Sequence, residues 1–435
     1  MSSEKIGLKI YNLAKEIWSY PRSLTGKGNV KTLQRFAKIC PNLNIKYVRS
    51  GQKFYDWKIP DEWNVKEAYI IDPNGKKICD FSKNNLHLVG YSTPIDKIIS
   101  LKDLKPHLHT LKNQKNAIPY VTSYYLKNWG FCLSQNQKNK LKEGKYRVKI
   151  NSTLKKGKLH YGEILIKGKI KKEIFLSTYI CHPSLANNEI SGMTLGIFLS
   201  NWINKLKNKR YSYRIIFIPE TIGSIMYISK NLKKLKKNVD AGFNITCVGD
   251  ERSYSYLPSK YGNTLSDKII LHVLKYGVKN FNKYKWVDRG GDERQYCSAG
   301  VDLPVATLMR TKYGEYKEYH TSLDKLGTVV TAKGLGESFN IYTKIIEALE
   351  NNNKLKFKIF CEPFLSKRNI YPTIHDAPNS EIMITADMLR HILSYADGNN
   401  DLIDIANLLD LPIWKLYPYI EILKKNKLIK YFYEN

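Results

Sequence analysis

Between residues 173 and 350, short apolar runs alternate with longer amphipathic segments, and this alternation limits the possible folds more than any other feature. The runs indicate strands, and the segments between them indicate helices because their apolar residues recur every three or four positions. Runs such as R-I-I-F-I-P are apolar almost throughout, which is typical of a parallel sheet covered on both faces. We therefore expect an α/β fold with a mostly parallel sheet. The expected strands are 173–181, 213–219, 241–248 and 304–309, and the expected helices are 191–206, 222–237, 265–277 and 334–350.

The regions on either side of this core have different patterns. Residues 4–18 and 30–39 carry apolar residues at helical spacing. Hairpins are expected around Pro73-Asn74-Gly75 and over 146–166, which predicts a β-rich module. After residue 380, three short helical patterns precede K-L-I-K-Y-F-Y, which is the element order of a winged helix. The predicted divisions are an N-terminal helical part of the core at 1–55, an inserted β-rich domain at 56–165, the α/β core at 166–355 and a winged-helix-like domain at 356–435.

The composition limits the classes of function. No window approaches the ~18 consecutive apolar residues of a membrane span, and M-S-S-E-K-I-G-L-K-I lacks a signal-peptide core, so a cytoplasmic location is expected. The seven cysteines are dispersed and never form C-x-x-C, which predicts reduced thiols. A net charge of +32 would suit a polyanionic partner, but the lysines are spread along the whole chain. Nucleic acid is therefore not expected as a partner.

Four polar residues lie at or just beyond the expected carboxyl ends of the core strands, where ligands bind in open α/β sheets. They are His182, Glu220, Asp250 and, after a longer segment, His320. Two imidazoles suit Zn²⁺, and a nearby carboxylate can take the proton of a water that attacks a carbonyl. This pattern predicts a zinc hydrolase with His182 and His320 as ligands and Glu220 as the base.

Cys181 is a second candidate nucleophile because it precedes a histidine. Successive side chains of a strand point to opposite faces, so we expect Cys181 and His182 to diverge. The cysteine is then expected to be a buried structural thiol.

Several segments together resemble a bacterial aminopeptidase-like family of unassigned function. They are Y-D-W-K-I-P-D-E-W, N-L-H-L-V-G-Y-S, I-P-Y-V-T-S-Y-Y, W-G-F-C-L-S, C-H-P-S-L-A-N, P-E-T-I-G-S, G-D-E-R-Q-Y-C-S and Y-G-E-Y-K-E-Y-H-T-S-L-D. The matches extend over nearly the whole chain. Members of that family are similar in fold to co-catalytic zinc aminopeptidases, carry an inserted β-rich domain, end in a winged helix and often accompany polysaccharide biosynthesis genes. The resemblance implies a zinc exopeptidase scaffold.

The resemblance also implies roles for individual residues. His182 matches the first metal-binding histidine, His320 in H-T-S-L-D matches the last, and Glu220 matches the catalytic base. The peptidases follow that base with a glutamate that binds a second metal, where this chain has Thr221. One zinc ion is therefore expected.

The most informative departure from the family is A-N-N-E-I-S-G in place of A-N-D-N-L-S-G, which puts Asn188 where the resemblance implies a bridging aspartate. An amide offers only a neutral oxygen to the metal, so weaker binding is expected. Glu189 could supply the missing carboxylate if the turn shifts by one residue. Asp292 and Glu293 are alternative sources of a carboxylate near the metal or substrate, and each could equally be a solvated loop acid.

The favoured function is zinc-dependent cleavage of an amide bond in a small peptidyl, aminoacyl or aminoacyl-sugar substrate. Arg294, Arg310 and Lys312 are candidate anchors for a substrate carboxylate or phosphate, with ordinary surface charge as the alternative. A second hypothesis is a degenerate, non-catalytic fold that binds a metabolite or partner. A third is a winged-helix DNA-binding regulator. The charge of the C-terminal segment argues against the DNA-binding hypothesis, because residues 361–435 hold eight basic and ten acidic residues. A protein partner or self-association suits this segment better.

Overall fold

The computed structural model describes residues 2–371 and 381–432. It divides the chain into two compact units, of which the first comprises Met1–Asp267 and Phe281–Asn340 and the second Lys268–Asn280 and Ile341–Asn435.

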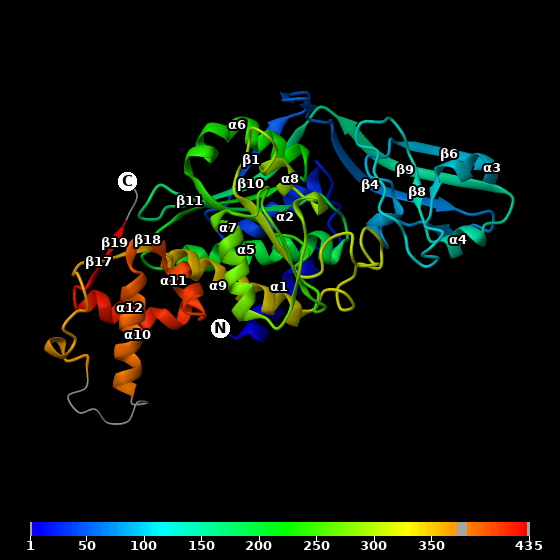
Figure 1. Cartoon of the computed structure of the whole chain (residues 1–435). Helices are drawn as coiled ribbons and strands as arrows, with labels where there is room; N and C mark the ends of the chain where they lie inside the picture. The colour runs from blue at the N-terminus through cyan, green and yellow to red at the C-terminus, as the bar shows by residue number, and fades with distance from the viewer. Residues whose placement is uncertain (1, 372–380, 433–435) are drawn as a thin grey trace. The chain divides into compact units, whose positions relative to one another are not determined.

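An eight-stranded sheet forms the centre of the first unit (Figure 1). Its four central strands, β12, β11, β13 and β16, run parallel, while β1, β10 and β14 join it through antiparallel pairings. The expected mostly parallel α/β core is confirmed. In spatial order the strands are β1 (Asn44–Arg49), β10 (Lys158–Ile166), β12 (Ser212–Ile218), β11 (Glu173–Tyr179), β13 (Val239–Asn244), β16 (Val305–Met309), β14 (Tyr254–Leu257) and β15 (Phe281–Lys283).

Helices flank this sheet, and their sequences explain why they form (Figure 1). In α1, Ser2 accepts a hydrogen bond from the Lys5 amide, and Ile6, Ile10 and Leu13 share the buried face. The six expected helices are all present, with ends within three residues of the expected positions. They are α1 (Ser3–Ile17), α2 (Lys27–Ala37), α5 (Ser191–Lys205), α6 (Ile222–Asn238), α7 (Leu265–Gly277) and α9 (Ala332–Asn351), of which the last two are divided between the two units. The short α8 (Glu293–Tyr296) was not expected.

The β-rich part of the first unit is built on a four-stranded antiparallel sheet in the order β5, β4, β9, β6. The hairpin expected around Pro73-Asn74-Gly75 is confirmed, because Ile71 of β4 pairs with Lys77 of β5. The strands are β4 (Glu62–Ile71), β5 (Lys77–Ile78), β6 (Ile95–Ser100) and β9 (Lys145–Lys155), with the short pairs β2 (Lys53–Phe54) with β3 (Trp57–Lys58) and β7 (Leu108–His109) with β8 (Phe131–Cys132). The helices are α3 (Leu101–Leu104) and α4 (Gln135–Asn139).

The second expected hairpin, over 146–166, is wrong. Its first strand, β9, pairs with β4 and β6, whereas its second strand, β10, pairs with β1 and β12 of the central sheet. The burial patterns give the reason, since β9 alternates between buried and exposed residues while most of β10 is buried. A strand covered on both faces belongs in the central sheet.

The second unit contains the expected three helices followed by a strand. Its sheet has the order β18, β17, β19, and Asp401 and Asp404 form a capping box at the start of α11. The elements are β17 (Lys354–Phe357), α10 (Glu381–Tyr395), β18 (Asp397–Asp401), α11 (Leu402–Leu408), α12 (Ile413–Lys425) and β19 (Ile429–Phe432). In neither unit is any described helix long and apolar enough to cross a membrane.

Candidate metal centre and active site

Three side chains expected at the site meet at the carboxyl ends of the parallel strands. His182 follows β11, Glu220 follows β12, and His320 lies beyond β16. The imidazole rings of His182 and His320 have centroids 5.5 Å apart, and His182 Nε2 lies 3.6 Å from a carboxylate oxygen of Glu220. The ring centroid of Tyr120, from the β-rich part, lies 5.1 Å from that of His182 and 5.3 Å from that of His320. The fold therefore gathers these groups from distant parts of the sequence.

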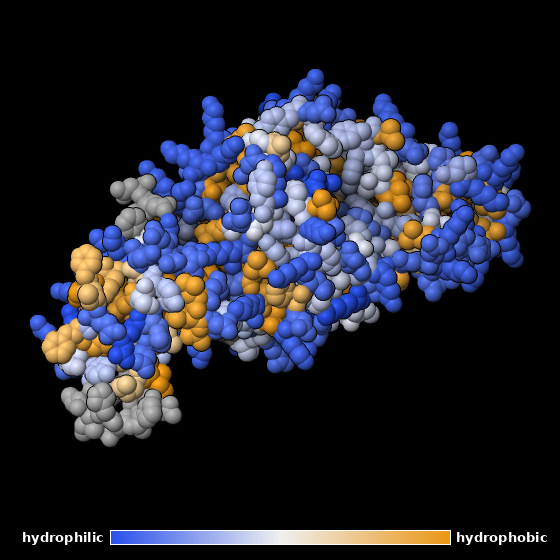
Figure 2. All heavy atoms as spheres, in the orientation of Figure 1, coloured by the Kyte–Doolittle hydropathy of each residue, from blue (hydrophilic) through white to orange (hydrophobic). Residues whose placement is uncertain are grey.

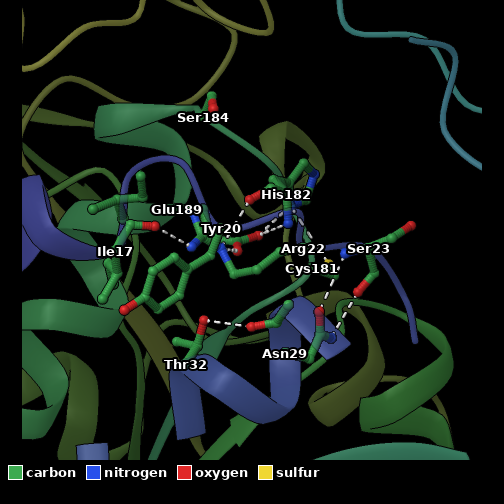
Figure 3. A network of polar contacts seen from close by, with 12 residues as sticks. Ile17, Tyr20, Arg22, Ser23, Asn29, Thr32, Cys181, His182, Ser184 and Glu189 are labelled. Atoms are coloured by element: carbon green, nitrogen blue, oxygen red, sulfur yellow. Dashed lines mark hydrogen bonds and ion pairs between the residues drawn. The ribbon is translucent and has the colours of Figure 1, made fainter. Parts of the chain in front are cut away.

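A buried carboxylate fixes the orientation of His182 (Figure 3). One oxygen of Glu189 lies 2.5 Å from His182 Nδ1 and also accepts a hydrogen bond from the His182 backbone amide. Because an ionised carboxylate only accepts, Nδ1 carries the proton and the lone pair lies on Nε2. Burial opposes protonation of the ring, but the negative charges of Glu189 and Glu220 outweigh it and raise the pKa of His182.

Arg22 completes this network and was not anticipated from the sequence. Its fully buried guanidinium donates through Nε to the carbonyl of His182 at 3.2 Å and through Nη1 to the carbonyl of Ile17 at 2.7 Å (Figure 3). Nε also lies 3.5 Å from Glu189. Burial lowers the pKa of Arg22, and the charge of Glu189 opposes that shift. The only signal in the sequence is an arginine in Y-P-R-S within a chain otherwise rich in lysine.

The segment between His182 and α5 forms one turn of π-helix over Ala186–Ile190. Such turns are rare and occur frequently at functional sites. Asp324 holds this turn by accepting hydrogen bonds from the amides of Asn187 and Asn188 at 2.7 and 3.0 Å. Burial raises the pKa of Asp324 to about 7. Asn188 is buried, and its Oδ1 has no hydrogen-bond partner among the described residues.

Asp250, the remaining strand-end acid, has a structural environment. Its carboxylate accepts hydrogen bonds from the side chain of Asn187, the amide of Arg252, and both the amide and hydroxyl of Thr311. This carboxylate thus joins the π-turn to the segment beyond β16.

A strained turn presents Glu220. The amide of Ile222 donates to the Glu220 carbonyl at 2.8 Å, and Thr221 has φ 63° and ψ −78°. These values define the rare positive-φ γ-turn, and such backbone strain costs of order 1–3 kcal/mol. Asp292 supports the turn by accepting from the Thr221 amide at 2.8 Å. Burial raises the pKa of Glu220, while the positive charges of His182 and Arg294 act against it.

His320 presents a second free imidazole nitrogen. Its Nε2 is buried and has no partner within the described part of the chain. Burial, together with the nearby His182, lowers the pKa of His320 to about 3, so the ring is neutral. Tyr319 stacks on the His320 ring with ring centroids 3.9 Å apart. The His320 carbonyl accepts a hydrogen bond from the Tyr120 amide at 2.9 Å.

Three side chains at the site offer atoms of a chemical type that zinc binds. His182 Nε2, His320 Nε2 and Asn188 Oδ1 are nitrogen and oxygen donors of the kind that zinc binds, and the last two are buried without partners. A different set, Cys181, His182 and Glu189, has potential ligand atoms within 4.8 Å of one another. In this second set, hydrogen bonds already join Glu189 to His182, and burial raises the pKa of the Cys181 thiol well above its ordinary value.

The expectation that the side chains of Cys181 and His182 diverge is wrong. Its Sγ lies 3.5 Å from His182 Nδ1, so the two side chains do not diverge. Strand β11 ends at Tyr179, and the alternation of a strand no longer applies to the residues beyond it. Burial raises the pKa of the thiol well above its ordinary value, and Sγ accepts a hydrogen bond from the Glu220 amide. These surroundings are those of a structural thiol.

The two acids of G-G-D-E-R-Q support loops. Asp292 is buried and accepts from the Ser224 hydroxyl as well as from Thr221, and burial with the neighbouring Glu220 charge raises its pKa to about 8. Both oxygens of Glu293 accept hydrogen bonds, from the amides of Gly290 and Gly291 and from side chains that include Asn244 and Tyr313.

A pocket of about 300 Å³ opens beside the predicted base. Arg294 lines it and donates to the Thr221 hydroxyl at 2.9 Å. Arg310 and Lys312 do not line it, because Arg310 pairs with Glu337 at 2.9 Å and Lys312 contacts the Tyr313 carbonyl. The other lining residues are Leu24, Trp57, Tyr124, Tyr125, Cys181, His182, Glu220, Thr221, Ile222 and Gln295. The aromatic wall was not anticipated, since its residues carry no charge that would mark them.

Comparison with known families assigns most of the chain to two family models. Residues 11–352 match the family described as a domain of unknown function, DUF4910. The chain belongs to the DUF4910 family. Residues 353–431 match a winged helix-turn-helix family. A relative from Clostridium acetobutylicum is similar over nearly the whole chain. It is 43% identical over 406 residues, which cover 93% of this chain and 92% of the relative. That relative is provisionally named a polysaccharide biosynthesis protein with an aminopeptidase-like domain.

Solved structures place the DUF4910 chain among aminopeptidase folds. A crystal structure from Clostridium acetobutylicum, provisionally named a peptidase, is 40% identical with a TM-score of 0.92, over 99% of this chain and 97% of that chain. The zinc aminopeptidase BSAP from Bacillus subtilis is 13% identical with a TM-score of 0.56, over 79% of this chain and 94% of that chain. The second likeness is one of fold alone.

Proposed function

We propose that this chain is a zinc-dependent hydrolase that cleaves an amide bond in a small peptidyl, aminoacyl or aminoacyl-sugar substrate. The observation that carries the proposal is the meeting of the buried His182 imidazole, the half-buried His320 imidazole and Glu220 beside an open pocket. An aminopeptidase-like fold supports it, because such sheets place their sites at the carboxyl ends of the strands.

In this proposal His182, His320 and Asn188 hold one zinc ion, which when bound supplies a Lewis acid beside the substrate carbonyl. Glu220 accepts the proton of the attacking water and passes it to the leaving nitrogen. The raised pKa of Glu220 suits that role, since a base works best with a pKa near the working pH. Glu189 and Arg22 position His182 and do not touch the substrate.

The lining of the pocket limits the substrate. Arg294 is exposed and offers a positive charge, while Glu220 is the one acid among the described residues that line the pocket. A carboxylate or phosphate on the substrate would therefore bind here more readily than a second cation. Trp57 and Tyr125 provide flat apolar surfaces suited to a side chain or a sugar ring. The name of the Clostridium acetobutylicum relative also supports testing aminoacyl-sugars.

The test combines metal analysis with a substrate screen. Protein purified without chelator is measured for zinc, and apo and zinc-loaded forms are screened against dipeptides, N-acyl amino acids and aminoacyl-sugars. Glu220→Gln serves as the matched control, because it keeps the size of the side chain and removes the base. Zinc-dependent turnover that is lost in this variant supports the proposal, and turnover that is equal in both proteins contradicts it.

A second candidate is a non-catalytic protein that keeps the fold and binds a metabolite. Asn188 and Thr221 favour it, because the aminopeptidase-like pattern has carboxylates at both positions. Ligand binding in the pocket without turnover of any amide, in both apo and zinc-loaded protein, distinguishes this candidate from the hydrolase.

A further inference from the structure

A second and larger cavity lies in the β-rich part of the first unit and has no role in the proposed hydrolysis. Its volume is about 550 Å³, which falls within the ~300–1,000 Å³ range of small-molecule sites. It is formed by the β4–β5 turn, the segment that follows β5, and the connection from α4 to β9. In Figure 2 the surface of the β-rich part shows mainly hydrophilic side chains.

Lysines dominate the charge of this cavity. Five lysines and two aspartates line it, and one lysine, Lys77, pairs with Asp80 at 3.2 Å. The other four, Lys76, Lys83, Lys140 and Lys142, make no ion pair with the described residues. One oxygen of Asp72 accepts hydrogen bonds from the amides of Asn74 and Lys76, so this acid is partly engaged by its own turn. The cavity thus holds unpaired positive charge from two separate segments.

The positive charge of this cavity comes from lysine, since no arginine is among the described residues that line it. Lysine acts as a compact point charge and is a common ligand of phosphate. Several unpaired lysines around one cavity therefore favour a phosphorylated ligand.

Neutral polar groups in the same cavity suit hydroxyl groups. His87 Nδ1 lies 2.8 Å from the carbonyl of Cys132, and since a carbonyl only accepts, Nδ1 carries the proton and Nε2 is left as an acceptor. Burial lowers the pKa of His87, which keeps the ring neutral. The side-chain oxygen of Gln137 accepts from the Ser134 amide at 2.9 Å, which leaves its NH₂ group to donate. Leu133 and Tyr146 add buried apolar surface.

We propose that this cavity binds a phosphorylated sugar, with the four unpaired lysines around the phosphate and with His87 and Gln137 contacting hydroxyl groups. The shared chemistry could come from a simple sugar phosphate or from a nucleotide sugar. The site is separate from the pocket beside Glu220, so it stands whether or not the chain is a hydrolase.

The test measures binding to the full-length protein by isothermal titration calorimetry. The probes are glucose 1-phosphate and UDP-glucose, with glucose and inorganic phosphate as controls. Lys76→Ala/Lys140→Ala removes one unpaired lysine from each side of the cavity. Lys233→Ala/Lys234→Ala, on the exposed surface of α6, removes the same charge elsewhere and is the matched control.

We expect at least one phosphorylated sugar to bind more tightly than glucose or inorganic phosphate. The cavity variant should weaken that binding about tenfold or more, because bonds to charged groups are strong, while the control variant should leave it unchanged. The probe that binds more tightly identifies the source of the phosphate. Absence of binding by both sugars, equal affinity for inorganic phosphate, or equal binding by the native and cavity-variant proteins overturns the proposal.

Discussion

Glu189→Gln is the most informative change at the candidate metal centre. Glu189 is fully buried, and its two oxygens face His182 Nδ1 at 2.5 Å and Arg22 Nε at 3.5 Å. Glutamine has nearly the same shape but no charge, and only one of its two terminal atoms can accept a hydrogen bond. The variant therefore leaves the Arg22 guanidinium without its counter-charge and weakens the hydrogen bond that orients the His182 imidazole.

The loss of the Glu189 charge should have two separate effects, one on stability and one on metal affinity. Breaking a buried ion pair by removing one partner costs about 3–5 kcal/mol of unfolding free energy, because the other charge stays buried. Loss of the group that orients a metal-binding histidine typically weakens metal binding by about 10–100-fold. We expect both effects in Glu189→Gln. Arg22→Met combined with Glu189→Gln should recover part of the stability, since no buried charge is then left unpaired.

The assays are urea unfolding for stability and competition with a chelator for zinc affinity. ¹⁵N chemical shifts of His182 in the apo-protein report which ring nitrogen carries the proton. The matched control is Glu173→Gln, which breaks the buried pair with Arg214 at 2.6 Å in the central sheet and away from the predicted ligands. It should lose stability and keep its zinc affinity.

Two results would refute this reasoning. If Glu189→Gln and Glu173→Gln lower zinc affinity equally, the effect on the metal is a general consequence of lost stability. If Glu189→Gln keeps native zinc affinity and the native proton position on His182, then Glu189 does not orient that ring.

Four further predictions concern the number of metal ions, the base, the amide ligand and the C-terminal unit. Elemental analysis of protein purified without chelator should find no more than one zinc ion per chain, because Thr221 offers no carboxylate for a second; two tightly held ions would contradict this. If the chain is a hydrolase, Glu220→Gln should lower kcat by ~10²–10⁴-fold with an unchanged circular dichroism spectrum, and a near-native kcat would place the base elsewhere. Asn188→Asp should raise zinc affinity in titrations of apo-protein, since it puts a charge at a buried oxygen that has no hydrogen-bond partner among the described residues; unchanged or weaker affinity would mean that Asn188 does not face the metal. The full chain should show no sequence-specific, salt-sensitive binding to duplex DNA in mobility-shift assays, because at the start of α12 the amide of Ile413 donates to His272 and Trp414 packs against that ring, so discrete specific complexes would oppose a packing role for α12.

The limits of sequence reasoning are clearest at the junction of the two sheets. Local periodicity located β9 and β10 well, but it paired them with each other across Lys156-Gly157. Which strands pair is decided by which surfaces need burial, and that depends on residues far away in the chain. The Pro73-Asn74-Gly75 hairpin was predictable because a tight turn fixes its own pairing.

At the site, sequence reasoning could nominate His182, Glu220 and His320, because strand ends in a parallel sheet are known to converge. It could not specify the partner of each group. Glu189 was one of several candidate sources of a carboxylate for the metal, and sequence reasoning did not anticipate that this carboxylate lies at His182 Nδ1, within the π-turn over Ala186–Ile190.

The sequence by itself therefore determined the α/β core, the winged-helix tail and the order of the polar residues at the strand ends, because periodicity and strand-end position are local properties. Only the tertiary structure decided the charges and orientations within the site. Arg22 lies 160 residues from the His182 carbonyl that it contacts, and the Tyr120 ring reaches both imidazoles from the β-rich part. Contacts of this kind form because a buried charge or ring must find a partner in space, and local patterns do not contain that information.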